Sequence, residues 1–134
     1  MMKRHLAHIA IIVDDYDRAI AYYTQKLKFI LKEDTLLAEQ KRWVLIAPSE
    51  NCETNILLAK ATNEAQLSSI GNQAGGRVLL FLFTDDFERD YQNLISEKVK
   101  IVRAPVSEKW GKVLVFEDVY GNLWDLIAPV NQAI

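Results

Sequence analysis

The most constraining feature of this chain is an internal repeat. Asp14-Asp15-Tyr16-Asp17-Arg18 returns seventy-one residues later as Asp85-Asp86-Phe87-Glu88-Arg89. A β-rich run precedes each copy, at residues 8–13 and 78–84, and each copy opens a stretch with apolar residues at three- and four-residue spacing, as in an amphipathic helix. We expect the first aspartate of each copy to cap its helix, because a carboxylate accepts the free N–H groups of the first turn. The sequence therefore predicts two modules of the same design.

The remainder of each half is patterned as three further strands. We expect them at 28–37, 41–47 and 54–59 in the first half and at 100–103, 113–116 and 123–127 in the second. A polar segment with one short helix at 64–69 joins the halves. We therefore predict an α+β fold in which two βαβββ modules, about 5–60 and about 77–129 with a linker at about 61–76, make up a single domain over 1–134. Their strands are expected to form a curved mixed sheet around a concave cup, with the helices outside.

Composition narrows the range of partners. The 134 residues are half apolar and a quarter charged, with a formal net charge of −2. No basic patch is evident, so neither nucleic acid nor an anionic membrane is an expected partner, and no apolar run has the roughly 18 residues of a spanning helix. Lys3 and Arg4 lead directly into a short β-patterned run, unlike a signal peptide, and the single Cys52 has no partner for an internal disulfide. We expect a cytoplasmic protein that binds a small molecule or another protein.

Two motifs make the chain resemble a known family. The opening Leu6-Ala7-His8-Ile9 and the closing Phe116-Glu117-Asp118-Val119-Tyr120-Gly121-Asn122-Leu123-Trp124-Asp125-Leu126 resemble the vicinal oxygen chelate superfamily, which holds glyoxalase I, extradiol dioxygenases, fosfomycin-resistance proteins and the bleomycin-resistance binding proteins. The runs Arg42-Trp43-Val44 and Lys109-Trp110-Gly111 are similar to a bacterial branch labelled glyoxalase-like or bleomycin-resistance-like. The resemblance covers nearly the whole chain. It implies the paired-module cup and a homodimer.

The resemblance also implies where a metal would be held. Family members that use a divalent ion bind it at four positions, which match His8, Leu57, Leu79 and Asp125 here. Leucine has no donor atom, and a catalytic metal site generally needs about three protein ligands. We therefore expect no metal or other cofactor, with His8 and Asp125 as weak candidate ligands if a divalent ion does bind.

Strand parity predicts the lining of the cup. Phe81 shares the face of Leu79, while His5, an odd number of residues from His8, points away, and Trp124 faces the helices. Trp110 lies in a loop-like stretch and is expected at the rim. Mostly apolar walls with a few polar groups are typical of a site for an apolar or aromatic molecule. The predicted ligand-binding residues are His8, Leu57, Leu79, Phe81, Trp110 and Asp125.

Three functions remain open from the sequence. The first is a metal-free binding protein for a small, largely apolar or aromatic compound. The second is a metal-dependent enzyme of the lyase or dioxygenase type, in which His8 and Asp125 are the candidate catalytic residues, either as metal ligands or as a hydrogen-bonded dyad. The third is a dimerisation module whose cup is filled by its own side chains, such as Phe81 and Phe83.

Overall fold

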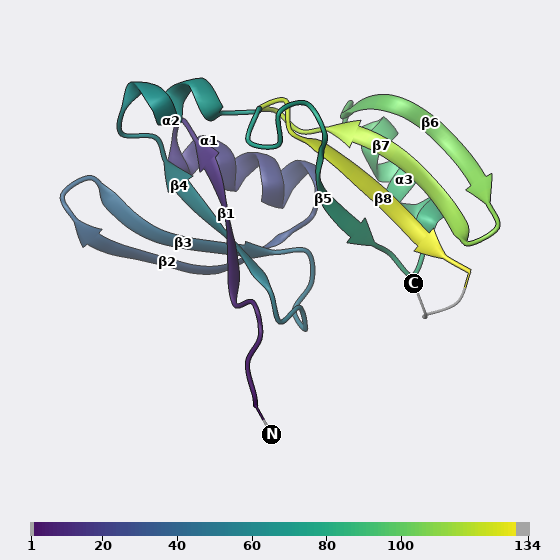
Figure 1. Ribbon diagram of the computed structural model, residues 1–134, viewed down its shortest axis with the longest axis horizontal. Helices are drawn as coiled ribbons and strands as arrows, with labels where there is room; N and C mark the ends of the chain where they lie inside the picture. Colours follow the sequence, from purple (N-terminus) through teal and green to yellow (C-terminus); the bar gives the residue numbers. More distant parts are fainter. Residues whose placement is uncertain (1, 131–134) are drawn as a thin grey trace. The chain divides into compact units, whose positions relative to one another are not determined.

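The computed structural model describes residues 2–130, and the chain divides into two compact units between Ile70 and Gly71. Each unit contains one βαβββ module, as the repeat predicts (Figure 1). The polar segment at 61–76 is split by this boundary, so its short helix belongs to the first unit. The α+β class is confirmed, and the strands form two curved four-stranded sheets, one for each module.

The first unit runs from β1 to α2. Its elements are β1 (His8–Val13), α1 (Tyr16–Ala21) with a π-helical turn η1 (Tyr22–Lys26), β2 (Ile30–Ala38), β3 (Lys41–Ala47), β4 (Asn55–Lys60) and α2 (Glu64–Ser69). The sheet has the order β1-β4-β3-β2. The first and last strands pair in parallel, whereas β3 pairs antiparallel with both of its neighbours.

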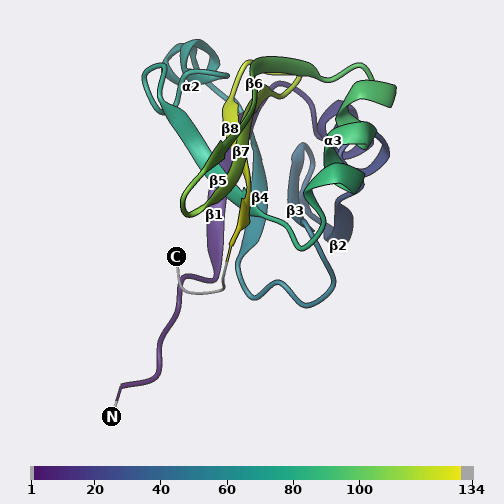
Figure 2. The ribbon, with the colours of Figure 1, turned by 90° about the vertical axis from the view of Figure 1, so that its right-hand side faces the viewer.

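The second unit repeats this arrangement. Its elements are β5 (Val78–Phe83), α3 (Phe87–Ser96), β6 (Lys100–Glu108), β7 (Gly111–Glu117) and β8 (Leu123–Pro129), in the sheet order β5-β8-β7-β6. Again the first and last strands are parallel and the others antiparallel. Figure 2 shows α3 to one side of this sheet, where it contacts β8.

The last three strands are longer than the sequence predicts, and β6 exceeds its predicted range the most. The pattern ends the strand at Arg103, but β6 continues to Glu108 through Pro105. Proline cannot donate to a strand ladder, yet it is tolerated in edge strands and at bulges. β6 is an edge strand, and its pairing with β7 shifts register between Arg103 and Val106. The proline therefore lies where the ladder is already interrupted.

The helix caps lie one residue later than predicted. Asp15 and Asp86 are the N-caps, and their side chains accept a hydrogen bond from the backbone N–H three residues on, at 2.8 Å and 3.1 Å. The predicted caps, Asp14 and Asp85, instead form ion pairs with the arginine four residues on, at 2.8 Å and 3.1 Å. Both modules show the same shift, so the repeat extends to these polar contacts.

A second contact is also repeated. The Arg42 guanidinium lies over the ring of Tyr16, 5.1 Å from its centroid, and the Lys112 ammonium lies over the ring of Phe87, at 5.6 Å. In each module the cation is on the second strand of the hairpin, β3 or β7, and the ring belongs to the first residue of the helix. The two cation–π pairs join helix to sheet in the same way in both units.

Alternation along the strands separates two faces. On the face covered by the helix, the side chains of each sheet are almost fully buried: Ile11, Val13, Val44, Ile46 and Leu58 in the first unit, and Leu114, Phe116, Trp124 and Leu126 in the second. Trp124 stacks on Phe116 at 5.7 Å, which confirms that its ring packs in the core. No helix within residues 2–130 is long and apolar enough to cross a membrane.

Candidate ligand-binding site

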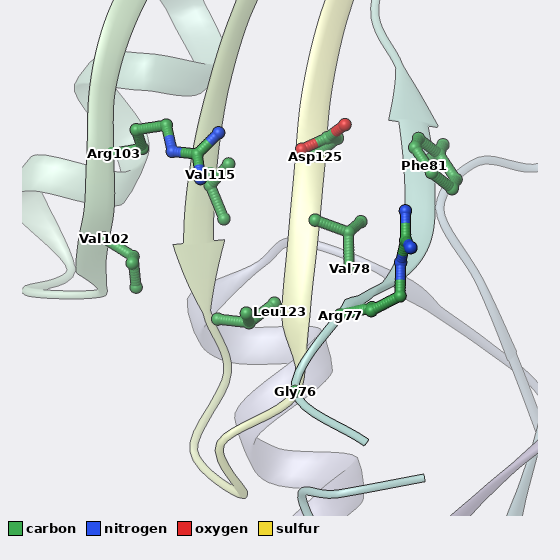
Figure 3. A pocket seen from close by; sticks show the side chains of 9 residues that line it. All are labelled: Gly76, Arg77, Val78, Phe81, Val102, Arg103, Val115, Leu123 and Asp125. Atoms are coloured by element: carbon green, nitrogen blue, oxygen red, sulfur yellow. The ribbon is translucent and has the colours of Figure 1, made fainter. Parts of the chain in front are cut away.

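A pocket of about 610 Å³ lies on the second sheet, on the face opposite to the buried Trp124 (Figure 3). All its walls come from the second unit: Gly76, Arg77, Val78, Phe81, Val102, Arg103, Val115, Leu123 and Asp125. Five of these nine side chains are apolar. The three charged ones are two arginines and one aspartate, so the pocket combines hydrophobic walls with a few ionic groups.

Strand register explains why these residues meet. Phe81 is the ladder partner of Asp125, Asp125 of Val115, and Val115 of Arg103. These four residues therefore form one row across β5, β8, β7 and β6. Directly opposite residues point to the same face of a sheet, so an aromatic ring, a carboxylate, an aliphatic group and a guanidinium stand side by side.

The first sheet has the same row with different chemistry. Its members are Ala10, Leu57, Leu45 and Glu33, paired in the same order. Leu57 is thus the counterpart of Asp125, as the repeat predicts. Because Ala10 has no ring and Leu57 no polar atom, the pairing of an aromatic ring with a carboxylate on the two parallel strands belongs to the second module, while the row of the first module has its one charged group, Glu33, on the edge strand β2.

Two opposing effects act on the pKa of the Asp125 carboxyl, and the pKa is raised on balance. Burial in the pocket wall raises its pKa above the ordinary value, because the charged form loses hydration. The positive charge of Arg103 acts in the other direction and lowers the pKa. In Figure 3 the Arg103 guanidinium points across Val115 toward the carboxylate.

Arg77 and Arg103 were missed by the sequence interpretation. Arg77 directly follows Gly76, at the first residue of the predicted second module, and Arg103 lies next to the register shift that separates it from Ile101. Parity counted along a strand fails at such a shift, because one extra residue reverses the face of every residue after it. A signal was available in the sequence: a cationic residue adjoins each predicted strand, since Arg77 directly precedes the run at 78–84 and Arg103 ends the strand at 100–103.

Leu79 does not line this pocket, although parity places it beside Phe81. The ladder between β5 and β8 pairs Val78 with Leu123 and then Leu80 with Trp124, so Leu79 is an extra residue in a bulge. Val78 consequently lines the pocket with Phe81, and Leu79 lines a smaller one of about 230 Å³ at the turn around Gly121. The predicted equivalence of His8 and Leu79 needs correction, since in register Val78 stands where His8 stands in β1.

The two predicted site residues of the first module lie on one face of its sheet. His8 is exposed, and its ring meets the edge of Trp43 with centroids 5.7 Å apart. Leu57 lies opposite Ala10, with the buried Leu58 on the other face. His8 and Asp125 belong to different units, and their pairing stays a prediction. His5 lies before β1 and is exposed.

Trp110 lies outside the pocket. It occupies the turn between β6 and β7, where its carbonyl accepts a hydrogen bond from the Val130 N–H at 2.8 Å. The pocket residues Arg103 and Val115 lie several pairs further along the same hairpin. Trp110 is 41% exposed, and its contact with a ligand at the rim of the cup stays a prediction.

The fold and the sequence motifs define the class of this protein. Paired βαβββ modules, each with its first and last strands parallel, are the architecture that the resemblance to the vicinal oxygen chelate class implies. A family model described as "Glyoxalase/Bleomycin resistance protein/Dioxygenase superfamily" matches residues 5–126, and the chain belongs to this superfamily.

Relatives and solved structures agree with this assignment. An uncharacterised protein of Shewanella frigidimarina is 54% identical over 127 residues, which cover 94% of each chain. The crystal structure of UcmS2 is 28% identical with a TM-score of 0.80, covering 94% of this chain and 98% of that one. The structure of TnmS3, described as an antibiotic-binding protein from Streptomyces sp. CB03234, is 25% identical with a TM-score of 0.76, covering 96% and 98%.

The residues at the family's metal positions do not fit a tightly held divalent ion. Leu57 and Leu79 have no donor atom, and Val78, which takes the register position of Leu79, has none either. Arg103 adds a positive charge beside Asp125, which opposes the approach of a cation. In the part of the chain that the structure describes, no three His, Cys, Asp or Glu residues are grouped as a metal site would require.

Proposed function

We propose that this protein binds a small, largely aromatic or apolar molecule in the pocket of its second module, without a metal ion. The observation that carries the proposal is the pocket itself: about 610 Å³, walled by Phe81, Val102, Val115 and Leu123, with Asp125 and two arginines among them. Ligand pockets for small molecules usually measure about 300–1,000 Å³ and pair apolar walls with a few polar groups.

The chemistry of the metal positions supports binding over metal catalysis. An enzyme that polarises its substrate through a metal needs about three protein ligands and an open coordination position. Here His8 and Asp125 are the two donors left at those positions, and an arginine faces the second of them. A resemblance to TnmS3, which is described as an antibiotic-binding protein, favours the same proposal.

The proposal extends to assembly and to the cell compartment. We infer that the protein acts as a homodimer, because several large apolar side chains on the second sheet are exposed in the single chain. Phe83 is 49% exposed and Val106 is 45% exposed. These residues lie on the two edge strands, β5 and β6, and large apolar side chains left exposed on a sheet are typical of surfaces that a partner covers. A cytoplasmic location stays the expectation drawn from the sequence.

A matched pair of phenylalanines tests the binding site. Phe81 lines the pocket, whereas Phe83 is on the same strand two residues later, opposite Ile127, and does not. With a panel of naphthalene-sized aromatic compounds in thermal-shift and calorimetric assays, Phe81→Ala should weaken the best binder about 5- to 30-fold, since apolar contact is lost. Phe83→Ala should leave the affinity within about twofold. Equal effects of the two substitutions would count against this pocket.

A further inference from the structure

The charge of the pocket is out of balance with that of the whole chain. The protein carries two more acidic than basic side chains, with a formal net charge of −2. In the pocket the basic side chains outnumber the acidic ones, since it is lined by two arginines and a single carboxylate. Asp125 is also the one group in the pocket whose ionised form is disfavoured by burial.

Two other arginines, Arg42 and Arg89, are each paired with two nearby acids. Arg42 forms ion pairs with Asp17 and Asp34 at 2.9 Å and 2.7 Å. Arg89 forms ion pairs with Asp85 and Asp90, both at 3.1 Å. These pairs show that, where an acid is near, the side chains of this protein reach ion-pair distance.

The two pocket arginines differ from these. Within residues 2–130, neither the Arg77 nor the Arg103 guanidinium lies within ion-pair distance of a carboxylate or makes a side-chain hydrogen bond. The interaction between Arg103 and Asp125 is electrostatic attraction without a hydrogen bond. In Figure 3 the two guanidinium groups rise from opposite sides of the pocket, Arg77 along β5 and Arg103 from β6. Their ten N–H donors are therefore available to a bound molecule.

Guanidinium groups on an apolar wall select a particular ligand chemistry. A planar guanidinium donates two parallel hydrogen bonds to a carboxylate, and such charge-assisted bonds are about twice as strong as neutral ones. The ring of Phe81 and the branched side chains of Val115 and Leu123 supply the surface for the body of the molecule. The pocket can therefore accommodate a molecule that combines an anionic group with an aromatic ring.

We propose that the ligand is an aromatic acid, with its ring against Phe81, Val115 and Leu123 and its ionised carboxylate on Arg103, while Arg77 on the opposite side of the pocket adds positive charge. This inference rests on the proposed function and adds the charge class of the ligand. Asp125 then acts against the ligand carboxylate and limits its affinity, rather than accepting a hydrogen bond from it.

The test compares two probes of equal shape. The affinities of 2-naphthoate, which is anionic, and 2-naphthamide, which is neutral, are measured by calorimetry at pH 7 and low salt. The acid should bind about 10- to 100-fold more tightly than the amide. Arg103→Met keeps an unbranched apolar stem but removes the guanidinium, and it should remove most of this preference, with a smaller loss for Arg77→Met. Arg18→Met, which removes a surface arginine paired with Asp14, should leave it unchanged.

Asp125→Asn sharpens the comparison. If the carboxylate repels the acid, the variant should bind 2-naphthoate several-fold more tightly than the wild type, with little change for the amide. Tight binding of both probes with no preference, or a preference that survives both Arg103→Met and Arg77→Met, would overturn the inference and leave the proposed function standing. If neither probe nor any other aromatic compound binds, both proposals fail.

Discussion

Phe81 and Asp125 are partners in the parallel ladder of β5 and β8, and both line the same pocket. In the first module the equivalent partners are Ala10 and Leu57. One scaffold thus presents an aromatic ring beside a carboxylate in one module and two aliphatic groups in the other. The difference between the modules lies in side chains at matched positions of the same backbone, which is how one fold supports many functions.

The first prediction concerns the turn between β7 and β8. The Asp118 carboxylate is buried and accepts hydrogen bonds from the backbone N–H groups of Tyr120 and Asn122 and from the Trp124 indole, at 2.9–3.0 Å. Asp118→Ala leaves buried donors without a partner, so urea unfolding should show a loss of about 2–4 kcal/mol. The exposed Asp85→Ala is the control and should cost less than about 1 kcal/mol. A small loss at Asp118 would mean that water replaces the carboxylate in this turn.

The second prediction concerns pH. Because burial raises the pKa of Asp125 in the folded protein above its ordinary value of 3.8, the folded state holds the proton more firmly than the unfolded chain. Stability contributed by this group is present at pH values below 3.8 and is lost as pH rises through the raised pKa. Asp125→Asn should therefore be more stable than the wild type at pH 7, and this advantage should shrink toward pH 3. The free energies of unfolding of both proteins at the two pH values measure the effect, and an unchanged advantage would contradict it.

The third prediction tests the bulge in β5. Val78 shares a face with Asp125, whereas Leu79 lines the separate pocket near Gly121. Val78→His should therefore place an imidazole near the Asp125 carboxylate and increase the affinity for Ni²⁺, while Leu79→His should not. Titration of Ni²⁺ by calorimetry gives the comparison. A larger gain for Leu79→His would show that the register of β5 is the one that uninterrupted alternation predicts.

The fourth prediction concerns assembly. Sedimentation equilibrium should report twice the chain mass of 15.4 kDa at micromolar concentration, because apolar side chains such as Phe83 and Val106 are exposed in the single chain. Replacing Val106 by aspartate should shift the equilibrium toward the monomer. A wild-type protein that sediments as a monomer would remove the dimer from this account without affecting the pocket.

Much of the fold follows from the sequence because the governing signals are local. Apolar alternation and acidic caps locate β1, α1, β5 and α3, and the short α2 helix is predicted at its observed residues, 64–69. The caps are misplaced by one residue because two adjacent aspartates are equally suited to the role. The helices begin at Tyr16 and Phe87, so the second aspartate of each pair is the N-cap. Whether a strand can continue through Pro105 likewise depends on sheet order, because a proline is tolerated in an edge strand such as β6, and local sequence does not specify which strand is at the edge.

The site was less predictable, for a physical reason. Phe81 and Asp125 follow from strand parity, and both lie in the pocket wall. Alternation misplaces Leu79, which lies outside this pocket, and misses Arg103, which lines it, because bulges in β5 and β6 insert residues that alternation counts as regular. A bulge depends on pairing between distant segments, so its position is not visible in either strand alone.

The most direct test of the central claim is binding with and without metal. The protein is dialysed against EDTA, and a panel of naphthalene-sized aromatic compounds that includes 2-naphthoate is titrated by calorimetry before and after addition of Zn²⁺, Ni²⁺ or Mn²⁺. We predict one-to-one binding in the metal-free protein, with a Kd that metal leaves unchanged and that Phe81→Ala raises. Binding that appears only with metal, or metal-dependent turnover of an α-ketoaldehyde glutathione adduct or a catechol, would contradict the account and favour an enzyme that uses His8 and Asp125.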